Sequence, residues 1–178
     1  MNRHGLLLTL TEPPPQMEEE FNAWYDSEHI PERLSIPGFR SARRWVAQGK
    51  PGEGKYLATY ELESPAVLVS PQYLAFFEKQ SPWTRRCLGK AVVFKRWACE
   101  QIEPGTADPH AAANALVLVC RDQPTAQLAL SGALVTRHFA ASSGEPRHIA
   151  LFDLAGHSAR DIPADWGGRI YQAYTDGA

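Results

Sequence analysis

Apolar and polar positions along the first half of the chain switch between the two-residue period of strands and the longer period of helices. The pattern predicts strands and helices in the order βαββαβ, at residues 4–12, 14–29, 39–48, 55–64, 71–87 and 91–100. This order is that of the ferredoxin-like unit. Pro31 disfavours helical backbone at Ile30, so we expect the first helix to end near His29.

The second half repeats the strand pattern but has much shorter helical stretches. Strands are expected at residues 115–122, 134–142, 147–156 and 168–176, with short helices around residues 123–132 and 162–167. Residues 147–155 align with residues 55–63, and residues 137–140 align with residues 44–47. Two neighbouring strands that align in step predict an internal duplication.

A four-stranded sheet with helices on one face needs cover for its other apolar face, and a second sheet is the usual cover. We therefore expect an α+β fold of tandem ferredoxin-like βαββαβ repeats that form an intrachain pseudo-dimeric α+β barrel, with shortened helices in the second repeat. A ligand is expected in the interior or mouth of this barrel. The expected domains are residues 1–103, which carry the site, and residues 114–178, joined by a linker at residues 104–113.

Two segments carry a resemblance to a known family, FNAWYDSEHIPERLSIPGFRSARRW at residues 21–45 and KYLATYELESPAVLVSPQY at residues 55–73. With their W-Y-x-x-E-H-I-P-E-R and P-G-F blocks, they resemble bacterial proteins of the dimeric α+β barrel superfamily, near the EthD-type families. That superfamily includes cofactor-free monooxygenases, muconolactone isomerases, polyketide cyclases and some haem enzymes, so the resemblance implies a fold more than a reaction.

The resemblance also implies a small hydrophobic substrate in a cleft between the first helix and the sheet. His29 matches the family's helix histidine and would be the group that transfers a proton. The second half has no aromatic pair, histidine or P-G-F block in the corresponding stretch, so we expect one site per chain.

Composition narrows the class of partner. The chain has 178 residues, a net charge of −2 and a pI near 6.3, which gives no basic field for a nucleic acid. The apolar run at residues 6–11 is too short for a signal sequence or a membrane span, so we expect a cytoplasmic protein without a membrane partner. A small molecule is the expected partner, and a homodimer in addition to the intrachain pair stays open.

His29 is the main candidate for catalysis. It follows Tyr25 by four residues and Phe21 by eight, so the three side chains lie on one stripe of a helix, and Asp26 could orient the imidazole ring. An imidazole that titrates near neutrality beside a carboxylate can act as a general acid or base. The structural alternative is a histidine at a helix end, where its charge favours the helix dipole.

Four aromatic residues are candidates for a pocket wall, namely Trp24, Tyr25, Tyr60 and Trp97. Such residues are more often part of a core, with the tyrosine hydroxyl bonded to water or backbone. Four arginines, Arg33, Arg40, Arg43 and Arg44, could hold a carboxylate or phenolate, but strand alternation places Arg43 opposite Arg40 and Arg44. We expect most of this arginine cluster to be solvated and paired with Glu28 or Glu32.

No metal ligand set or cofactor motif is present. Glu28, His29 and Glu32 do not form an H-E-x-x-H motif, and we expect neither a metal nor a cofactor. A single axial histidine leaves little trace in a sequence, so haem binding stays open.

These observations favour a cofactor-independent enzyme, an isomerase, cyclase, dehydratase or other lyase, that transfers a proton on a small apolar carbonyl or aromatic compound. His29 would be the acid or base and Asp26 its orienter. Two alternatives stay open: a non-catalytic small-molecule binding or stress-associated protein, and a cofactor-free monooxygenase in which the pocket desolvates a substrate carbanion.

Overall fold

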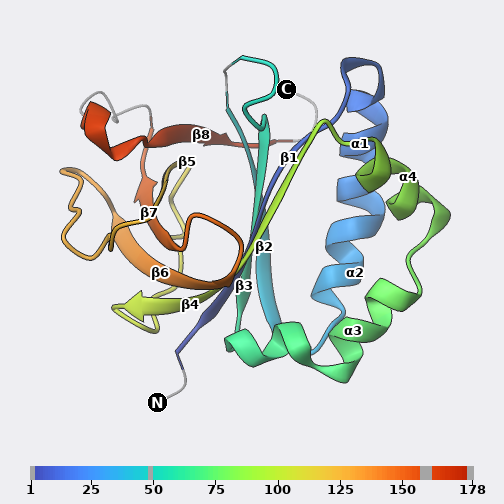
Figure 1. Cartoon of the computed structure of the whole chain (residues 1–178), viewed down its shortest axis with the longest axis horizontal. Helices are drawn as coiled ribbons and strands as arrows, with labels where there is room; N and C mark the ends of the chain where they lie inside the picture. The colour runs from blue at the N-terminus through green and yellow to red at the C-terminus, as the bar shows by residue number, and fades with distance from the viewer. Residues whose placement is uncertain (1–2, 48–49, 157–161, 176–178) are drawn as a thin grey trace.

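Eight antiparallel strands close into one barrel in the computed structural model, which describes residues 3–47, 50–156 and 162–175 (Figure 1). The strands are β1 Gly5–Glu12, β2 Phe39–Val46, β3 Tyr56–Leu62, β4 Val93–Glu103, β5 Ala115–Arg121, β6 Val135–Ser143, β7 His148–Leu154 and β8 Arg169–Ala173. Around the barrel their order is β1-β3-β2-β8-β5-β7-β6-β4. The strands of the first half are therefore neighbours, as are those of the second.

Helices lie against the outside of the barrel on the side formed by the first four strands (Figure 1). They are the 3₁₀ turns η1 Pro15–Met17 and η3 Pro65–Val69, the π-helical turn η2 Tyr25–His29, and the α-helices α1 Glu18–Trp24, α2 Ile30–Leu34, α3 Pro71–Glu78 and α4 Pro82–Lys90. A further 3₁₀ turn, η4 Ala164–Trp166, lies on the other side of the barrel, against the strands of the second half. The helix predicted at residues 71–87 is thus two helices, because Ser81 caps a new one by accepting a hydrogen bond from the Thr84 amide. Within the described residues, no helix is long and apolar enough to cross a membrane.

The predicted fold class, tandem ferredoxin-like βαββαβ repeats in a pseudo-dimeric α+β barrel, is wrong. The predicted strands are present, but they belong to one closed sheet, in which β2 pairs with β8 and β4 pairs with β6. The helices expected in the second half are absent from the described residues there, where residues 123–132 form turns and bends and only the 3₁₀ turn η4 interrupts the coil before β8.

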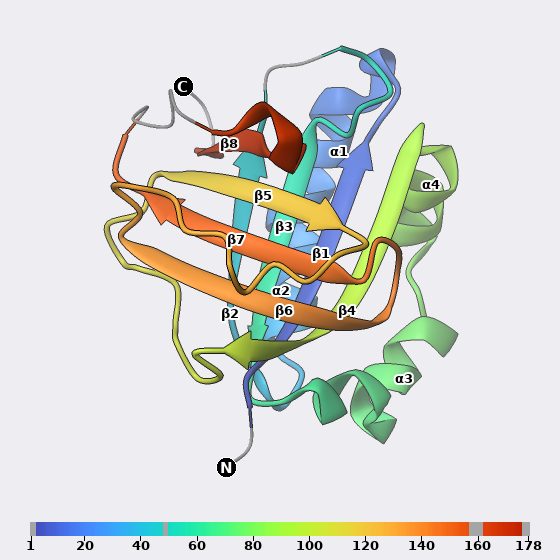
Figure 2. The same ribbon diagram turned by 60° about the vertical axis from the view of Figure 1, so that its left-hand side comes forward.

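In the second half, loops rather than helices lie over the outer face of the sheet (Figure 2). Leu128, Leu130 and Ala133 from the loop before β6, together with Ile162 and Trp166, pack over the outward side chains of β5 and β7. The predicted internal duplication is also wrong, because the described residues of the second half lack the corresponding helices. Strands that align in step share only the alternation that every strand of a barrel needs in order to bury one face.

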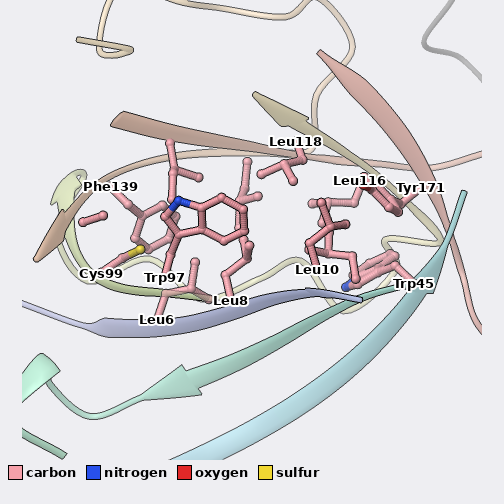
Figure 3. Packing of buried hydrophobic residues seen from close by; sticks show 14 of the residues in the cluster. Leu6, Leu8, Leu10, Trp45, Trp97, Cys99, Leu116, Leu118, Phe139 and Tyr171 are labelled. Carbon is pink, nitrogen blue, oxygen red and sulfur yellow. The ribbon is translucent and has the colours of Figure 1, made fainter. Parts of the chain in front are cut away.

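The barrel interior is filled by side chains. Every second residue of each strand points inward, so that Leu6, Leu8 and Leu10 of β1 meet Leu116, Leu118 and Phe139 from the other half (Figure 3). Trp45 and Trp97 lie in the same cluster, and both are about 2% exposed. The barrel interior is therefore a packed core. Space for a ligand lies at one mouth of the barrel, where Glu12, Lys55 and Arg169 line a cavity of about 760 Å³, and outside the barrel, between the sheet and the helices.

Candidate functional site

A π-helical turn, η2, interrupts the first helix at Tyr25–His29. The amide of Ile30 donates to the carbonyl of Tyr25, five residues earlier, and widens the helix by one residue. The helix predicted to end at His29 instead continues through α2, because the wide turn places Pro31 in the first turn of a new α-helical segment, where a missing N–H costs little. Turns of this kind occur frequently at functional sites.

Arg44 of β2 anchors the π-helical turn to the barrel. Its Nη1 donates to Asp26 Oδ1 at 2.7 Å, and its guanidinium lies 4.6 Å from the centre of the Tyr25 ring and 4.0 Å from that of Tyr174. The Arg44 side chain is 3% exposed. Asp26 was expected to orient His29, but among the described residues no hydrogen bond joins these two side chains.

A small cavity of about 40 Å³ lies between the π-helical turn and the outer face of β1, β3 and β4. Tyr25 and His29 line it from the turn, Arg33 from α2, and Thr9 and Tyr60 from the sheet. The hydroxyl groups of Tyr25 and Thr9 are hydrogen-bonded at 3.1 Å, which fixes the Tyr25 ring. Sequence analysis thus identified three of the residues that line this cavity, Tyr25, His29 and Tyr60.

Three buried polar atoms at the cavity have no hydrogen-bond partner among the described residues. They are His29 Nδ1, Arg33 Nη1 and Tyr60 Oη. Buried polar groups are nearly always paired, so three unpaired atoms around one cavity are an exception that needs an explanation. The cavity is larger than the roughly 10–15 Å³ that one water molecule needs. The cavity is therefore suited to a small polar group of a ligand, which would satisfy these atoms.

The electrostatic environment of the cavity favours a negative charge. Burial, and to a smaller extent the charges of Arg33 and Arg44, lower the pKa of His29 to about 3. Burial also raises the pKa of the Tyr60 phenol well above its ordinary value. At neutral pH the imidazole and the phenol are therefore uncharged beside a cationic guanidinium. The prediction of an imidazole that titrates near neutrality is wrong, because it took no account of burial.

Aromatic rings enclose the His29 imidazole. Its centre lies 4.4 Å from the Trp24 ring, 5.0 Å from Tyr25 and 6.4 Å from Tyr60. Trp24 does not line the cavity but packs behind His29, and its Nε1 donates to Thr84 Oγ1 of α4 at 3.0 Å. The rings therefore hold the imidazole in one orientation.

These residues do not fit a haem. A haem needs a slot for its macrocycle and an axial nitrogen that faces the iron, whereas the cavity of about 40 Å³ is far smaller than the roughly 300 Å³ of an ordinary ligand site. Across residues 3–47, 50–156 and 162–175, no group of three His, Cys, Asp or Glu side chains is placed to hold a metal ion.

Trp97 lies on the other side of the sheet. It belongs to the barrel interior, and its Nε1 donates to the carbonyl oxygen of Pro146 at 3.1 Å. Tyr60 lies on β3 of the same sheet and points outward to the cavity. The structure therefore places Trp97, like Trp24, outside the cavity lining, whereas Tyr25, His29 and Tyr60 line the cavity.

Sequence analysis named Arg33 only as one of four arginines that could hold a carboxylate or phenolate, and it expected most of that cluster to be solvated. Arg33 is 7% exposed, and its guanidinium lies 5.4 Å from the Tyr73 ring and 5.6 Å from the Phe77 ring of α3. Glu28, its expected partner, instead accepts a hydrogen bond from Thr84 Oγ1 at 3.1 Å. The signal was present, because Arg33 continues the Tyr25–His29 stripe by four more residues.

Comparison with known proteins supports the fold alone. No family description matches this sequence, and no curated protein does. An anthrone oxidase-like protein superposes with a TM-score of 0.61 at 10% identity, over 98% of this chain and 92% of that one. A protein provisionally assigned as a monooxygenase, from Fusobacterium nucleatum subsp. nucleatum, gives 0.53 at 7% identity, over 97% and 92% of the two chains.

A third solved structure, of a protein provisionally assigned as a chlorite dismutase, gives a TM-score of 0.51 at 8% identity, over 98% of this chain and 96% of that one. These three likenesses are consistent with the predicted superfamily at the level of fold alone, and nothing in them points to the EthD-type families in particular.

Proposed function

We propose that this chain is an enzyme of the monooxygenase type that acts, without a bound cofactor, on a small phenolic or enolisable carbonyl compound. One observation carries the proposal: the free Nη1 of Arg33 shares a buried cavity with the unpaired atoms of His29 and Tyr60. The oxidase-like and monooxygenase neighbours support this reaction class, although they are at most 10% identical.

The cavity would act by stabilising an oxyanion. A buried guanidinium favours the ionised form of a phenol or enol whose oxygen lies against it, and a preorganised donor in a dry site is worth more than one in water. The Tyr60 hydroxyl would donate a second hydrogen bond to the same oxygen. The proton that the substrate loses would pass to water, which leaves an electron-rich anion in the site.

Dioxygen would be the co-substrate of such an anion. Oxidation of a methylene carbon to a carbonyl consumes one dioxygen, whose O–O bond breaks. One oxygen atom becomes the carbonyl oxygen, and the other leaves as water with the two hydrogens of the methylene. The substrate supplies the electrons, so no external reductant is needed.

His29 would hydrogen-bond to the substrate and would not be its base. With a pKa of about 3, the imidazole is a poor acceptor for the proton of a phenol. Transfer from a phenol with a pKa of about 10 would cost on the order of 10 kcal/mol before any stabilisation by Arg33. This cost weighs against the lyase or isomerase mechanism with His29 as base, and the neighbours give that mechanism no support.

Oxygen uptake with anthrone as the first probe tests the proposal. We expect one dioxygen consumed per quinone formed, and a loss of about 10²–10³ in kcat/KM for Arg33→Met. Arg40→Met is the matched control, because Arg40 pairs with Asp108 away from the cavity, and it should retain wild-type kinetics. Thermal unfolding of both variants checks that they fold.

Three results would contradict the proposal. Turnover without oxygen uptake would indicate a lyase or isomerase. Binding of phenols and anthrones without any turnover would indicate a binding protein. Full activity in Arg33→Met would move the reaction away from this cavity.

A further inference from the structure

The cavity at His29 is too small for the body of an aromatic substrate. A cavity of roughly 150 Å³ is needed to enclose one benzene ring, and this one measures about 40 Å³. A carboxylate or phenolate oxygen fits, but a fused ring system does not. If the site acts as proposed above, most of the ligand must lie outside the cavity.

Exposed apolar side chains surround the cavity at its outer edge. Phe77 of α3 and Phe94 of β4 both line the cavity, yet they are 44% and 48% exposed. Leu74 precedes Phe77 by one turn of α3 and is 48% exposed. We call these three residues the apolar rim. Contiguous exposed apolar side chains often mark a binding surface, whereas single exposed apolar side chains are common and need no explanation.

The charge inside the cavity selects the head group of the ligand. Arg33 and Arg96 both line the cavity, whereas its described lining contains neither Asp nor Glu. Arg96 donates through Nη2 to Tyr73 Oη at 3.0 Å, but Arg33 Nη1 is buried and unpaired. A cation with a free donor in a buried site favours an anion over a neutral group, because charge-assisted hydrogen bonds are the stronger ones.

We infer that the site is bipartite and takes an aromatic anion. The anionic oxygen enters the cavity and accepts a hydrogen bond from Arg33 Nη1, while the flat apolar body lies across the rim of Leu74, Phe77 and Phe94. This inference rests on the proposed function for the location of the site, but it concerns binding and requires no turnover.

Titration calorimetry with 2-naphthoate and its neutral isostere 2-naphthamide separates the two halves of the site. We expect one naphthoate bound per chain, at least about tenfold more tightly than naphthamide, because hydrogen bonds to charged groups are the stronger ones. Arg33→Met should bring the two affinities together. The double variant Phe77→Ser/Phe94→Ser should weaken both by about tenfold and keep their ratio.

Leu134→Ser is the matched control, because Leu134 is 38% exposed next to β6, on the half of the barrel without α-helices. It should bind both probes as the wild type does. Urea unfolding of each variant confirms that a lost affinity is not a lost fold. If the double variant unfolds, Phe94→Ser alone tests the rim, because Phe94 is 48% exposed, and it should weaken both probes by a smaller factor.

Equal affinity for the two probes in the wild type would overturn the charged half of the inference. Unchanged affinity in the rim variant would overturn the apolar half. A wild-type dimer that the rim substitutions convert to a monomer, measured by light scattering, would assign the rim to a second copy of the chain. Failure of anthrone oxidation alone would remove the proposed reaction and leave the naphthoate result standing.

Discussion

Asp26 pairs with Arg44 across the boundary between the π-helical turn and β2, with 2.7 Å between Asp26 Oδ1 and Arg44 Nη1. The pair holds the turn that places His29 at the cavity, so Asp26 is a positioning residue. Asp26→Ala should cost about 1–3 kcal/mol in the free energy of unfolding, because the Arg44 side chain, 3% exposed, loses its carboxylate. Urea unfolding measures this loss.

Glu145→Ala is the control for that prediction. The Glu145–Arg147 pair has a comparable distance of 2.8 Å, but both side chains are more than half exposed, so the change should stay within about 0.5 kcal/mol. An unchanged unfolding midpoint in Asp26→Ala together with a large loss of kcat would instead support a direct partnership of Asp26 with His29.

The burial of His29 predicts an acid-sensitive fold. The pKa of His29 is about 3 in the folded chain and near its ordinary value of about 6.5 when unfolded. The unfolded state therefore binds the extra proton between these values, and stability falls as pH falls from about 6.5 towards 3, by up to about 1.4 kcal/mol per pH unit. Above about pH 6.5 this contribution is fully present.

His29→Gln should flatten that pH dependence. The measurement is the urea midpoint of wild type and variant between pH 7 and pH 4. Parallel curves for wild type and His29→Gln would mean that the imidazole is already charged in the folded state.

Tyr60→Phe separates stability from activity. The Tyr60 hydroxyl is buried and unpaired, so its removal should leave the free energy of unfolding unchanged or raise it by about 1 kcal/mol. The same change removes a proposed donor to the substrate oxygen and should lower kcat by about 10²-fold. A variant that is strongly destabilised would show that the hydroxyl has a structural partner.

Trp97→Phe tests whether Trp97 lies on the inner face of the sheet, opposite the face that carries the cavity. Trp97 donates to Pro146 O inside the barrel, so the substitution should cost about 1–3 kcal/mol of stability and leave the affinity for 2-naphthoate unchanged. Thermal unfolding and calorimetry on one sample measure both. A loss of affinity in a variant of normal stability would return Trp97 to the pocket wall, where the sequence alone had placed it.

Local patterning in the sequence was sufficient to locate the strands, because each strand buries one face in the barrel interior and alternation records that burial. The same local pattern could not predict that the strands close into one barrel. The pairing of Trp45 with Ala173 joins residues far apart in the chain, and nothing in either local pattern specifies it. The first helix passes Pro31 for a similar reason, since the π-helical turn is anchored by Arg44 on another element.

The site could be predicted only in part. The spacing of Tyr25 and His29 was visible in the sequence, and Arg33 lay on the same stripe, but a charged residue is expected at the surface unless its partners are known. The partners of Arg33 are the rings of Tyr73 and Phe77, which come from α3 and are positioned by tertiary packing. Which face Tyr60 and Trp97 take depends on strand register, which the side-chain pattern leaves ambiguous when both faces are apolar.

The buried pair of Arg137 on β6 and Glu61 on β3 joins the two halves of the barrel, and its contribution to stability can be measured. Arg137 Nη1 donates to Glu61 Oε1 at 2.8 Å, and Arg137 Nη2 lies 3.6 Å from Asp153 Oδ1, with all three side chains at most 5% exposed. Arg137→Met should cost about 3–5 kcal/mol at pH 7, because it leaves two carboxylates without a cation.

That loss should shrink as pH falls towards 4. Burial already raises the pKa of Glu61, and without Arg137 this carboxyl takes up a proton more readily in the folded state than in the unfolded one. The double variant Arg137→Met/Glu61→Gln should therefore recover part of the lost stability at pH 7, where Glu61→Gln removes one uncompensated charge. Urea unfolding at pH 7 and pH 4.5 measures both effects, and a cost independent of pH would assign it to packing of the Arg137 stem.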